Sequence, residues 1–348
     1  MAAKKVIPVV LSIVISVVLI GYLSTRIELD DLKQIFANIH YPALFAFMAI
    51  SLLTSILRAV RYKWLLLPAQ IGFGSILLVT FIRNLFVDLL PARLGSLSYV
   101  YILNKRLKYA FEEAASTFVV AFVLDFLTLS PFLAISILVV GLGATSVSSV
   151  SLLLIALFFF LLIYIVMWKI IPLSQLMLTV YQSLLRFLSL NRKKWAVISV
   201  DKIKLTIDGL EQIKERKILR PLFLLSLVLR LGKYGSLYFL LLSLLHSRGF
   251  SFQNLSFWKT ILGITGGELT GALPIKGLAG FGTWESGWAL AFRLMNFDSK
   301  ISILSGIGVH LITNLFEYTL GILSILILAF PFVLKKKCFN NTSDKYNE

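Results

Sequence analysis

Long uninterrupted runs of hydrophobic residues are the first feature of the chain. Residues 6–25 and 41–57 contain no charged residue, and neither does the whole stretch from 126 to 168. A helix of about 20 apolar residues is long enough to cross a bilayer. The stretch 126–168 is too long for one crossing, and its segment GLGATSVSS (141–149) predicts a turn between two helices.

Two more apolar runs predict spans in the C-terminal half. One carries Arg230 and Lys233, and the other is interrupted only by Glu317. Together the runs predict an all-α fold, a polytopic membrane helix bundle. Its six full spans are residues 6–25, residues 41–67, two helices within 126–168, residues 221–245 and residues 301–334.

Composition supports a membrane protein and changes how the charge is interpreted. Hydrophobic residues make up 58% of the 348 residues, charged residues only 15%, and the mean hydropathy is +0.88. Such a chain has too much apolar surface for a soluble domain. The net charge of +17 would suggest nucleic acid in a soluble protein. Here basic cytoplasmic loops explain it, and we expect no nucleic-acid partner.

The segment 174–219 differs from the rest of the chain because basic residues are frequent in it. Its apolar residues recur at helical spacing, as Ile203, Ile207, Leu210 and Ile213 illustrate. This pattern predicts one or two amphipathic helices on the cytoplasmic leaflet, with anionic inner-leaflet lipids as their partners.

The distribution of basic loops predicts the orientation. The basic loops are assigned to the cytoplasm, and the two loops that are not basic, 26–40 and 141–149, to the outside. Both termini are then cytoplasmic, including a tail at 335–348, and residues 1–348 form one transmembrane domain in the cell (inner) membrane. The loops assigned to the inside are 61–63, 105–108, 169–220 and 335–337.

This assignment conflicts with single crossings at two places. Residues 75–103 lie between the inside loops 61–73 and 104–113. Residues 258–293 lie between 246–257 and 294–300, which both need to be outside. Each segment contains a Pro and Gly break near its middle, so its limbs are too short to cross the bilayer separately. We therefore predict two re-entrant helical hairpins that enter from opposite faces.

The two breaks resemble each other. LLPARLGS (89–96) and ALPIKGLAG (272–280) share Leu-Pro, a cation two residues after the Pro, and a following Gly. Arg93 in the first corresponds to Lys276 in the second. Because the hairpins have opposite orientations, this similarity predicts an inverted repeat, which is typical of secondary transporters.

The charged side chains on the two predicted hairpins form the candidate substrate-binding site. Ser96 and Thr283 are expected to be N-caps of the second half-helices, whose N-termini attract anions. Arg93 and Lys276 would hold an anionic headgroup beside them. Alternatively these charges pair among themselves. The candidate substrate-binding residues are Arg83, Asp88, Arg93, Ser96, Glu268, Lys276 and Glu285.

Charges also occur within the spans themselves. Arg58, Arg61 and Lys63 are expected near one end of their helix, where they can reach an interface. The set Arg58, Asp125, Arg230 and Glu317 either bridges helices or touches ligand.

No pattern in the chain predicts catalysis, a metal or a cofactor. His40, His246 and His310 share no metal-ligand spacing. Phosphate-binding, dinucleotide-binding and hydrolase signatures are absent from the sequence. The four-residue spacing of Gly263, Gly267 and Gly271 favours close helix packing.

NLFVDLLPARLGSLSYVYILNKR (84–106) resembles the first signature of the lysylphosphatidylglycerol synthase transmembrane-region family, a flippase-like family. ALPIKGLAGFGTWESGWAL resembles its second signature, usually Pro-Gly-Gly-Leu-Gly-x-x-Glu. Lys276 departs from the first of the usual glycines. The resemblance covers residues 5–335 and includes no aminoacyltransferase domain. It implies lipid translocation rather than lipid synthesis, as in fused members that move aminoacylated phosphatidylglycerol.

Three functions are compatible with these residues. The first is a flippase or transporter that moves an anionic-headgroup or aminoacylated phospholipid, or a lipid-linked precursor, between leaflets. The second is a non-catalytic membrane partner of an envelope glycosyltransferase or lipid-modifying enzyme, and a homo-oligomer is compatible with either. The third is an enzyme that uses Glu268 and Glu285 as acid and base, but it lacks a nucleophile or metal.

Overall fold

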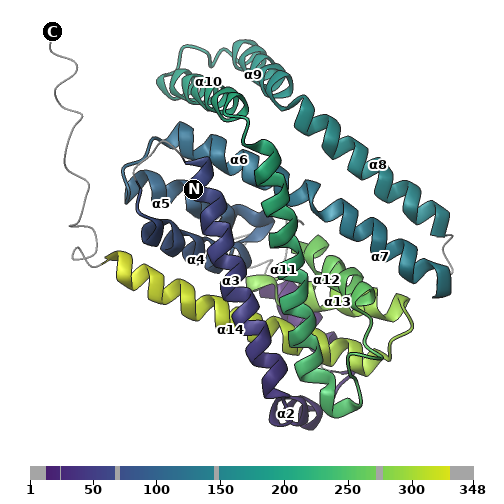
Figure 1. Cartoon of the computed structure of the whole chain (residues 1–348). Coiled ribbons are helices and arrows are strands. Elements are labelled where there is room, and N and C mark those ends of the chain that lie inside the picture. The colour runs from purple at the N-terminus through teal and green to yellow at the C-terminus, as the bar shows by residue number, and fades with distance from the viewer. Residues whose placement is uncertain (1–12, 24, 67–70, 145–148, 272–276, 330–348) are drawn as a thin grey trace.

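The computed structural model describes residues 13–23, 25–66, 71–144, 149–271 and 277–329, and every element in this part of the chain is helical (Figure 1). The elements in chain order are an apolar helix Ile13–Leu23, α2 (Leu29–Ala37), α3 (Tyr41–Leu65), α4 (Phe73–Leu89), η1 (Pro91–Leu97), α5 (Ser98–Lys105), α6 (Phe111–Leu127), α7 (Leu129–Ala144), α8 (Ser149–Trp168), α9 (Ile170–Phe187), α10 (Lys194–Glu215), α11 (Leu219–Leu245), η2 (His246–Arg248), α12 (Phe257–Gly271), η3 (Leu278–Gly280), α13 (Thr283–Leu294) and α14 (Ser299–Ala329).

Four segments among the described residues are long and apolar enough to cross a membrane. They are Tyr41–Leu65, Phe111–Val140, Leu219–Arg248 and Ser299–Ala329. The second contains α6 and most of α7, so this span begins earlier than the uncharged run predicts. The division of residues 126–168 between α7 and α8 is confirmed. The all-α membrane fold is therefore confirmed, while six full spans stay a prediction.

The centre of the molecule is the packing of α3 against α11, which lie side by side in Figure 1. Small residues allow this close approach: a Cβ on Gly232 of α11 would lie 2.4 Å from Oγ1 of Thr54 on α3. α14 packs against α4 and α13. Side chains such as Phe47, Tyr234 and Trp288 fill the space between these helices.

The first predicted break is a 3₁₀ segment that folds back on the helix before it. α4 ends at Leu89, and η1 begins at Pro91, which is tolerated at the first position of a helix. A Cβ on Gly95 would lie 1.6 Å from the backbone oxygen of Phe86. Only glycine allows η1 to lie this close to the end of α4.

The second predicted break separates two antiparallel packed helices, α12 and α13. A Cβ on Gly266 would lie 2.8 Å from the oxygen of Gly287, and a Cβ on Gly263 would lie 1.9 Å from the ring of Phe292. A Cβ on Gly267 would lie 2.8 Å from the ring of Trp284, so the packing role predicted for Gly263 and Gly267 is confirmed. After residues 272–276, which lie outside the described residues, Gly280 and Gly282 both have a φ of 84°.

The two breaks meet inside the molecule. η1 contacts η3, α4 contacts η3, and α12 contacts η1. Two segments that are almost 190 residues apart in the chain therefore form one region, as the sequence comparison of the breaks predicts. The position of this region in the bilayer stays a prediction, and so does the inverted-repeat relation between the two breaks.

The loops gather at two ends of the molecule. At one end the Arg216 guanidinium donates to the backbone oxygen of Leu65 and Lys202 pairs with Glu112 at 2.6 Å. At the other end Asp31 pairs with Lys300. The loops assigned to the cytoplasm, as far as the structure describes them, therefore share one end. Which end faces the cytoplasm stays a prediction.

Two expectations about helix starts are wrong by a small shift. Ser96 lies inside η1, buried, and the N-cap of α5 is Leu97 without a side-chain cap. The N-cap of α13 is Gly282, and Thr283 is the first residue of that helix. Each helix follows a short 3₁₀ segment, and sequence propensities do not distinguish such a segment from an α-helical start.

The expectation that Arg58 and Arg61 reach an interface is also wrong. Arg61 is fully buried, and its Nη1 lies 2.6 Å from the Asp125 carboxylate of α6. Arg58 lines an internal cavity. Of the three basic residues at this end of α3, Lys63 is exposed. The helix continues two turns beyond Arg58, so the arginines lie deeper in the bundle than the charge pattern suggests.

Candidate functional site

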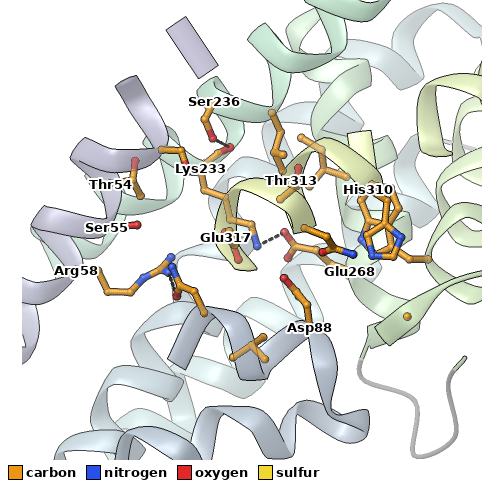
Figure 2. Close-up of a pocket in the computed structure, with 18 of the residues that line it drawn as sticks. Thr54, Ser55, Arg58, Asp88, Lys233, Ser236, Glu268, His310, Thr313 and Glu317 are labelled. Atoms are coloured by element: carbon orange, nitrogen blue, oxygen red, sulfur yellow. Dashed lines mark hydrogen bonds and ion pairs between the residues drawn. The ribbon is translucent and has the colours of Figure 1, made fainter. Parts of the chain in front are cut away.

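A cavity of about 210 Å³ lies where α3, α4, α11, α12 and α14 converge on the second break (Figure 2). α6 contributes Asp125 to its wall, η3 contributes Gly280, and α13 contributes Trp284. Charged side chains gather here although the surrounding helices are apolar. Those in the described lining are Arg58, Arg83, Asp88, Asp125, Arg230, Lys233, Glu268 and Glu317, four basic and four acidic.

Two arginines on neighbouring helices share one amide oxygen. Nη1 of Arg58 on α3 donates to Oδ1 of Asn84 at 2.9 Å, and Nη1 of Arg83 on α4 donates to the same atom at 3.4 Å. The Nε atoms of both arginines are buried and have no hydrogen-bond partner among the described residues. A guanidinium pair held in this way can still donate to an anion in the cavity.

An ion-pair network links α11 to α12 on another wall. The Glu268 carboxylate lies 2.6 Å from Nζ of Lys233 and 3.5 Å from Nη1 of Arg230. Figure 2 shows Lys233 and Glu268 joined across the cavity. Arg230 also donates to the backbone oxygen of Asp125. Glu268 thus forms ion pairs with two cations of α11. For Glu268, this is the internal pairing that the sequence analysis gave as an alternative to ligand binding.

Two carboxyl groups face the cavity from the packed helices α4 and α14. Asp88 of α4 and Glu317 of α14 both line the cavity, and so do Arg58 and Lys233. Both carboxyl groups point into the cavity in Figure 2. The cavity therefore offers cations and carboxyl groups on neighbouring walls.

Several buried polar atoms on α14 have no hydrogen-bond partner in the part of the chain that the structure describes. Asn314 is only 4% exposed, and both polar atoms of its amide lack a hydrogen-bond partner among the described residues. The hydroxyl of Thr313 is in the same position. Both residues line the cavity. Because an unsatisfied buried polar group costs about 1–3 kcal/mol, these atoms are suited to bind water or a polar ligand.

His310, one turn before Asn314, belongs to a separate cluster at the cavity wall. Its Nδ1 lies 2.6 Å from Oε1 of Glu285, and Oε2 of Glu285 accepts the backbone N–H of Gly282 at 2.8 Å. The imidazole lies between the rings of Phe281 and Trp284, at centroid distances of 4.7 and 4.9 Å. Glu285 is not among the lining residues, so it lies behind His310.

The predicted site residues fall into three groups. Arg83, Asp88 and Glu268 line the cavity. Glu285 is buried behind it as the partner of His310, and Ser96 is buried in η1 outside the lining. The side chain of Arg93 and the whole of Lys276 lie outside the described residues, so their headgroup role stays a prediction.

The sequence did not single out several residues that line the cavity. Asn84, Lys233, His310, Thr313 and Asn314 were not candidates. One available signal was helical register: Lys233 follows Arg230 by three residues, and Glu317 follows Asn314 by three. Polar residues at this spacing within an apolar helix lie on one face.

The family model described as the lysylphosphatidylglycerol synthase TM region matches residues 9–321. No curated protein matches the chain.

Proposed function

Because the chain belongs to the lysylphosphatidylglycerol synthase transmembrane-region family, we propose that it moves a phospholipid with an anionic headgroup between the two leaflets of a membrane. The observation that carries this proposal is the cavity, which gathers eight charged side chains among apolar helices. A lipid headgroup crossing the bilayer needs such a polar environment, because hydrocarbon does not solvate its charge.

Arg58 and Arg83 are the residues that we propose bind the phosphate. Guanidinium groups form strong charge-assisted hydrogen bonds with phosphate oxygens. Their Nε atoms lack partners among the described residues, and Asn84 orients both side chains. By contrast, Arg61 and Lys233 already have carboxylate partners at 2.6 Å. Arg93 and Lys276 are further candidates for the same role.

The two broken helices support the proposal through their position. η1 and η3 contact each other, and the second break contributes Gly280 to the cavity wall. Irregular backbone at membrane depth is tolerated where it lines a polar cavity. We propose that the two breaks are re-entrant tips, related as an inverted repeat, that allow the cavity to open toward either leaflet in turn.

We also propose that α9 and α10 lie against the anionic inner leaflet. α10 packs part of its apolar face on the protein, where Ile207 and Leu210 are buried. α9 leaves its own apolar residues exposed: Leu176 is 59% exposed, Met177 72% and Phe187 85%. Arg192 and Lys193 lie in the loop between the helices and Lys194 begins α10, where cations suit an anionic surface.

Lipid exchange in proteoliposomes tests the main proposal. The protein is reconstituted with phosphatidylglycerol labelled on an acyl chain, and a reductant that does not cross the membrane measures the outer-leaflet fraction. Arg58→Gln should lower the exchange rate about tenfold to a hundredfold, because a charge-assisted hydrogen bond is worth roughly 1.5–3 kcal/mol. Arg293→Gln is the matched control, since Arg293 is exposed at the end of α13.

The outcomes separate the alternatives. Exchange that is absent from the wild-type protein would contradict translocation. Chemical conversion of the labelled headgroup, measured by mass spectrometry, would instead favour a membrane enzyme. Neither exchange nor conversion would favour a non-catalytic partner of another envelope enzyme. Equal rates for Arg58→Gln and Arg293→Gln would remove Arg58 from the binding site.

A further inference from the structure

Glu285 makes a contact with His310 in addition to the one that caps α13. Glu285 already stabilises the start of α13, because Oε2 accepts the Gly282 N–H at 2.8 Å. Helix capping needs only that contact. The second oxygen, Oε1, lies 2.6 Å from the His310 Nδ1, and the two residues are 2% and 6% exposed. Ionisable pairs at such depth are costly and are found mainly where a protein uses them.

Hydrogen-bond chemistry determines which nitrogen faces the cavity. An ionised Glu285 oxygen can only accept, so Nδ1 of His310 carries the proton between them. Nε2 is then an acceptor in the neutral ring and a donor in the charged ring. His310 lines the cavity, whereas Glu285 does not. The ring therefore presents to the cavity the nitrogen whose character changes with protonation.

The surroundings hold the ring in that orientation. Phe281 and Trp284 lie on it at 4.7 and 4.9 Å, and Trp288 stacks on Trp284 at 5.0 Å. A Cβ on Gly280 would lie 3.5 Å from Cε1 of His310, so the turn also limits movement of the ring. Aromatic faces stabilise an adjacent cation, and the Glu285 carboxylate provides its counter-charge.

A proton on His310 would change the charge balance of the whole cavity. The charged groups that face the cavity are Arg58 of α3, Arg83 and Asp88 of α4, Asp125 of α6, Arg230 and Lys233 of α11, Glu268 of α12, and Glu317 of α14. Basic and acidic groups are equal in number among them. Added positive charge at this wall therefore favours an anionic ligand, and its loss favours release.

From this geometry we infer that His310 and Glu285 form a proton-binding site in the cavity wall, and that a proton on His310 strengthens the binding of an anionic headgroup. The second clause rests on the proposed function, whereas the first does not. Thermodynamic linkage makes the effect reciprocal: a bound headgroup favours proton uptake by the same factor. Exchange between leaflets is then sensitive to the proton concentration on each side.

Nuclear magnetic resonance tests the proton site directly. The chain has three histidines, so the double variant His40→Gln, His246→Gln leaves His310 as its only imidazole. With ¹⁵N-labelled histidine, the ring shifts should report proton uptake across about pH 5–8, the range in which histidine changes charge. Glu285→Gln keeps a capping side chain but removes the counter-charge, so it should weaken proton uptake by His310. Shifts that do not change with pH in the parent variant would overturn the inference.

Binding of short-chain phosphatidylglycerol to the purified protein tests the coupling. Affinity of the wild-type protein should be roughly fivefold or more higher at pH 5.5 than at pH 8, which is the usual range of coupling between sites. His310→Gln should remove this difference, and His246→Gln should retain it. Titration of His310 without any pH effect on affinity would overturn the coupling. No lipid binding at any pH would count against the proposed function, while titration of His310 would still establish the proton site.

Discussion

The guanidinium of Arg61 lies 2.6 Å from the Asp125 carboxylate and joins α3 to α6 in the interior of the bundle. Nη1 of Arg61 also donates to the Ser226 hydroxyl of α11 at 3.0 Å, so one side chain connects three helices. Arg61 is fully buried. Asp125 at the same time forms part of the cavity wall, which links the stability of the bundle to the shape of the candidate site.

The Arg61–Asp125 pair should be strongly coupled in stability. Arg61→Met leaves the carboxylate without its partner, and breaking a buried pair in this way costs about 3–5 kcal/mol. Adding Asp125→Asn should recover most of that loss, because the stranded charge is removed as well. Thermal unfolding in detergent measures both. Losses that simply add in the double variant would show that the two residues do not interact.

The sequence predicts the fold well where the signal is local. Apolar runs locate α3, α11 and α14, and Pro91 with Gly95 locates the first break, because span length and backbone conformation depend on neighbouring residues. Ser96 and Thr283 fail as N-caps because the actual N-caps are their neighbours, Leu97 one residue later and Gly282 one residue earlier.

The cavity is less predictable because it depends on tertiary packing. Arg58, Asn84 and Glu317 occupy ordinary helical positions on α3, α4 and α14, and no local motif indicates that they converge. His310 illustrates the same limit: its partner Glu285 is recognisable as an acidic residue near a helix start, but the pair exists only because α13 packs on α14. The sequence therefore identifies most of the charged residues of the cavity, whereas Asn84, His310, Thr313 and Asn314 become apparent only from the packing.

Cysteine labelling should place the loops at two ends on opposite sides of the membrane. Cys338 is the only cysteine, so Cys338→Ser gives a cysteine-free background. Single cysteines at Lys63 and Lys105, both exposed, should react with an impermeant maleimide from the cytoplasmic side. A cysteine at the exposed Lys33 should react from the other side. Reaction at Lys63 and Lys105 from opposite sides would eliminate the first re-entrant hairpin.

The exposed stripe of α9 should enter an anionic bilayer. In the same background, an environment-sensitive fluorophore at Met177 should shift to the blue in vesicles that contain phosphatidylglycerol, since Met177 is 72% exposed in the structure. A fluorophore at the exposed Asp208 of α10 is the control and should remain in water. High salt should reduce any part of the shift that depends on anionic lipid. Identical spectra at Met177 and Asp208 would contradict leaflet binding.

Acid should weaken the end of the molecule where α2 meets α14. Nζ of Lys300 lies 2.6 Å from the Asp31 carboxylate, and this contact lowers the pKa of Asp31. Since the pKa of Asp31 is lower in the folded state than in the unfolded state, its contribution is present above about pH 4 and is lost as the pH falls through the folded value.

Unfolding temperatures measured at pH 7 and at pH 3 test this effect. Asp31→Asn should melt below the wild-type protein at pH 7, and the difference should shrink at pH 3. Asp30→Asn is the matched control, because Asp30 pairs with Lys33 in a contact where both side chains are 76% exposed. Exposed pairs of this kind contribute little. A difference for Asp31→Asn that persists unchanged in acid would contradict the ionic role.

Glycine at position 95 should be essential for both the fold and the cavity. A Cβ there would lie 1.6 Å from the Phe86 oxygen and 2.1 Å from its carbonyl carbon, and these are backbone atoms that cannot rotate away. Gly95→Ala must therefore displace η1 from α4, at a cost on the order of 1–3 kcal/mol or more. Val87 and Asp88, which follow Phe86 directly, line the cavity, so the same displacement should reduce lipid exchange.

Gly235→Ala is the control, because a Cβ at Gly235 of α11 meets no atom within 4 Å, and removal of a helical glycine stabilises by roughly 0.5–1 kcal/mol. The unfolding temperature should therefore fall in Gly95→Ala and rise in Gly235→Ala. Lipid exchange should be reduced only in Gly95→Ala. Unchanged stability and exchange in Gly95→Ala would show that η1 does not lie against the end of α4.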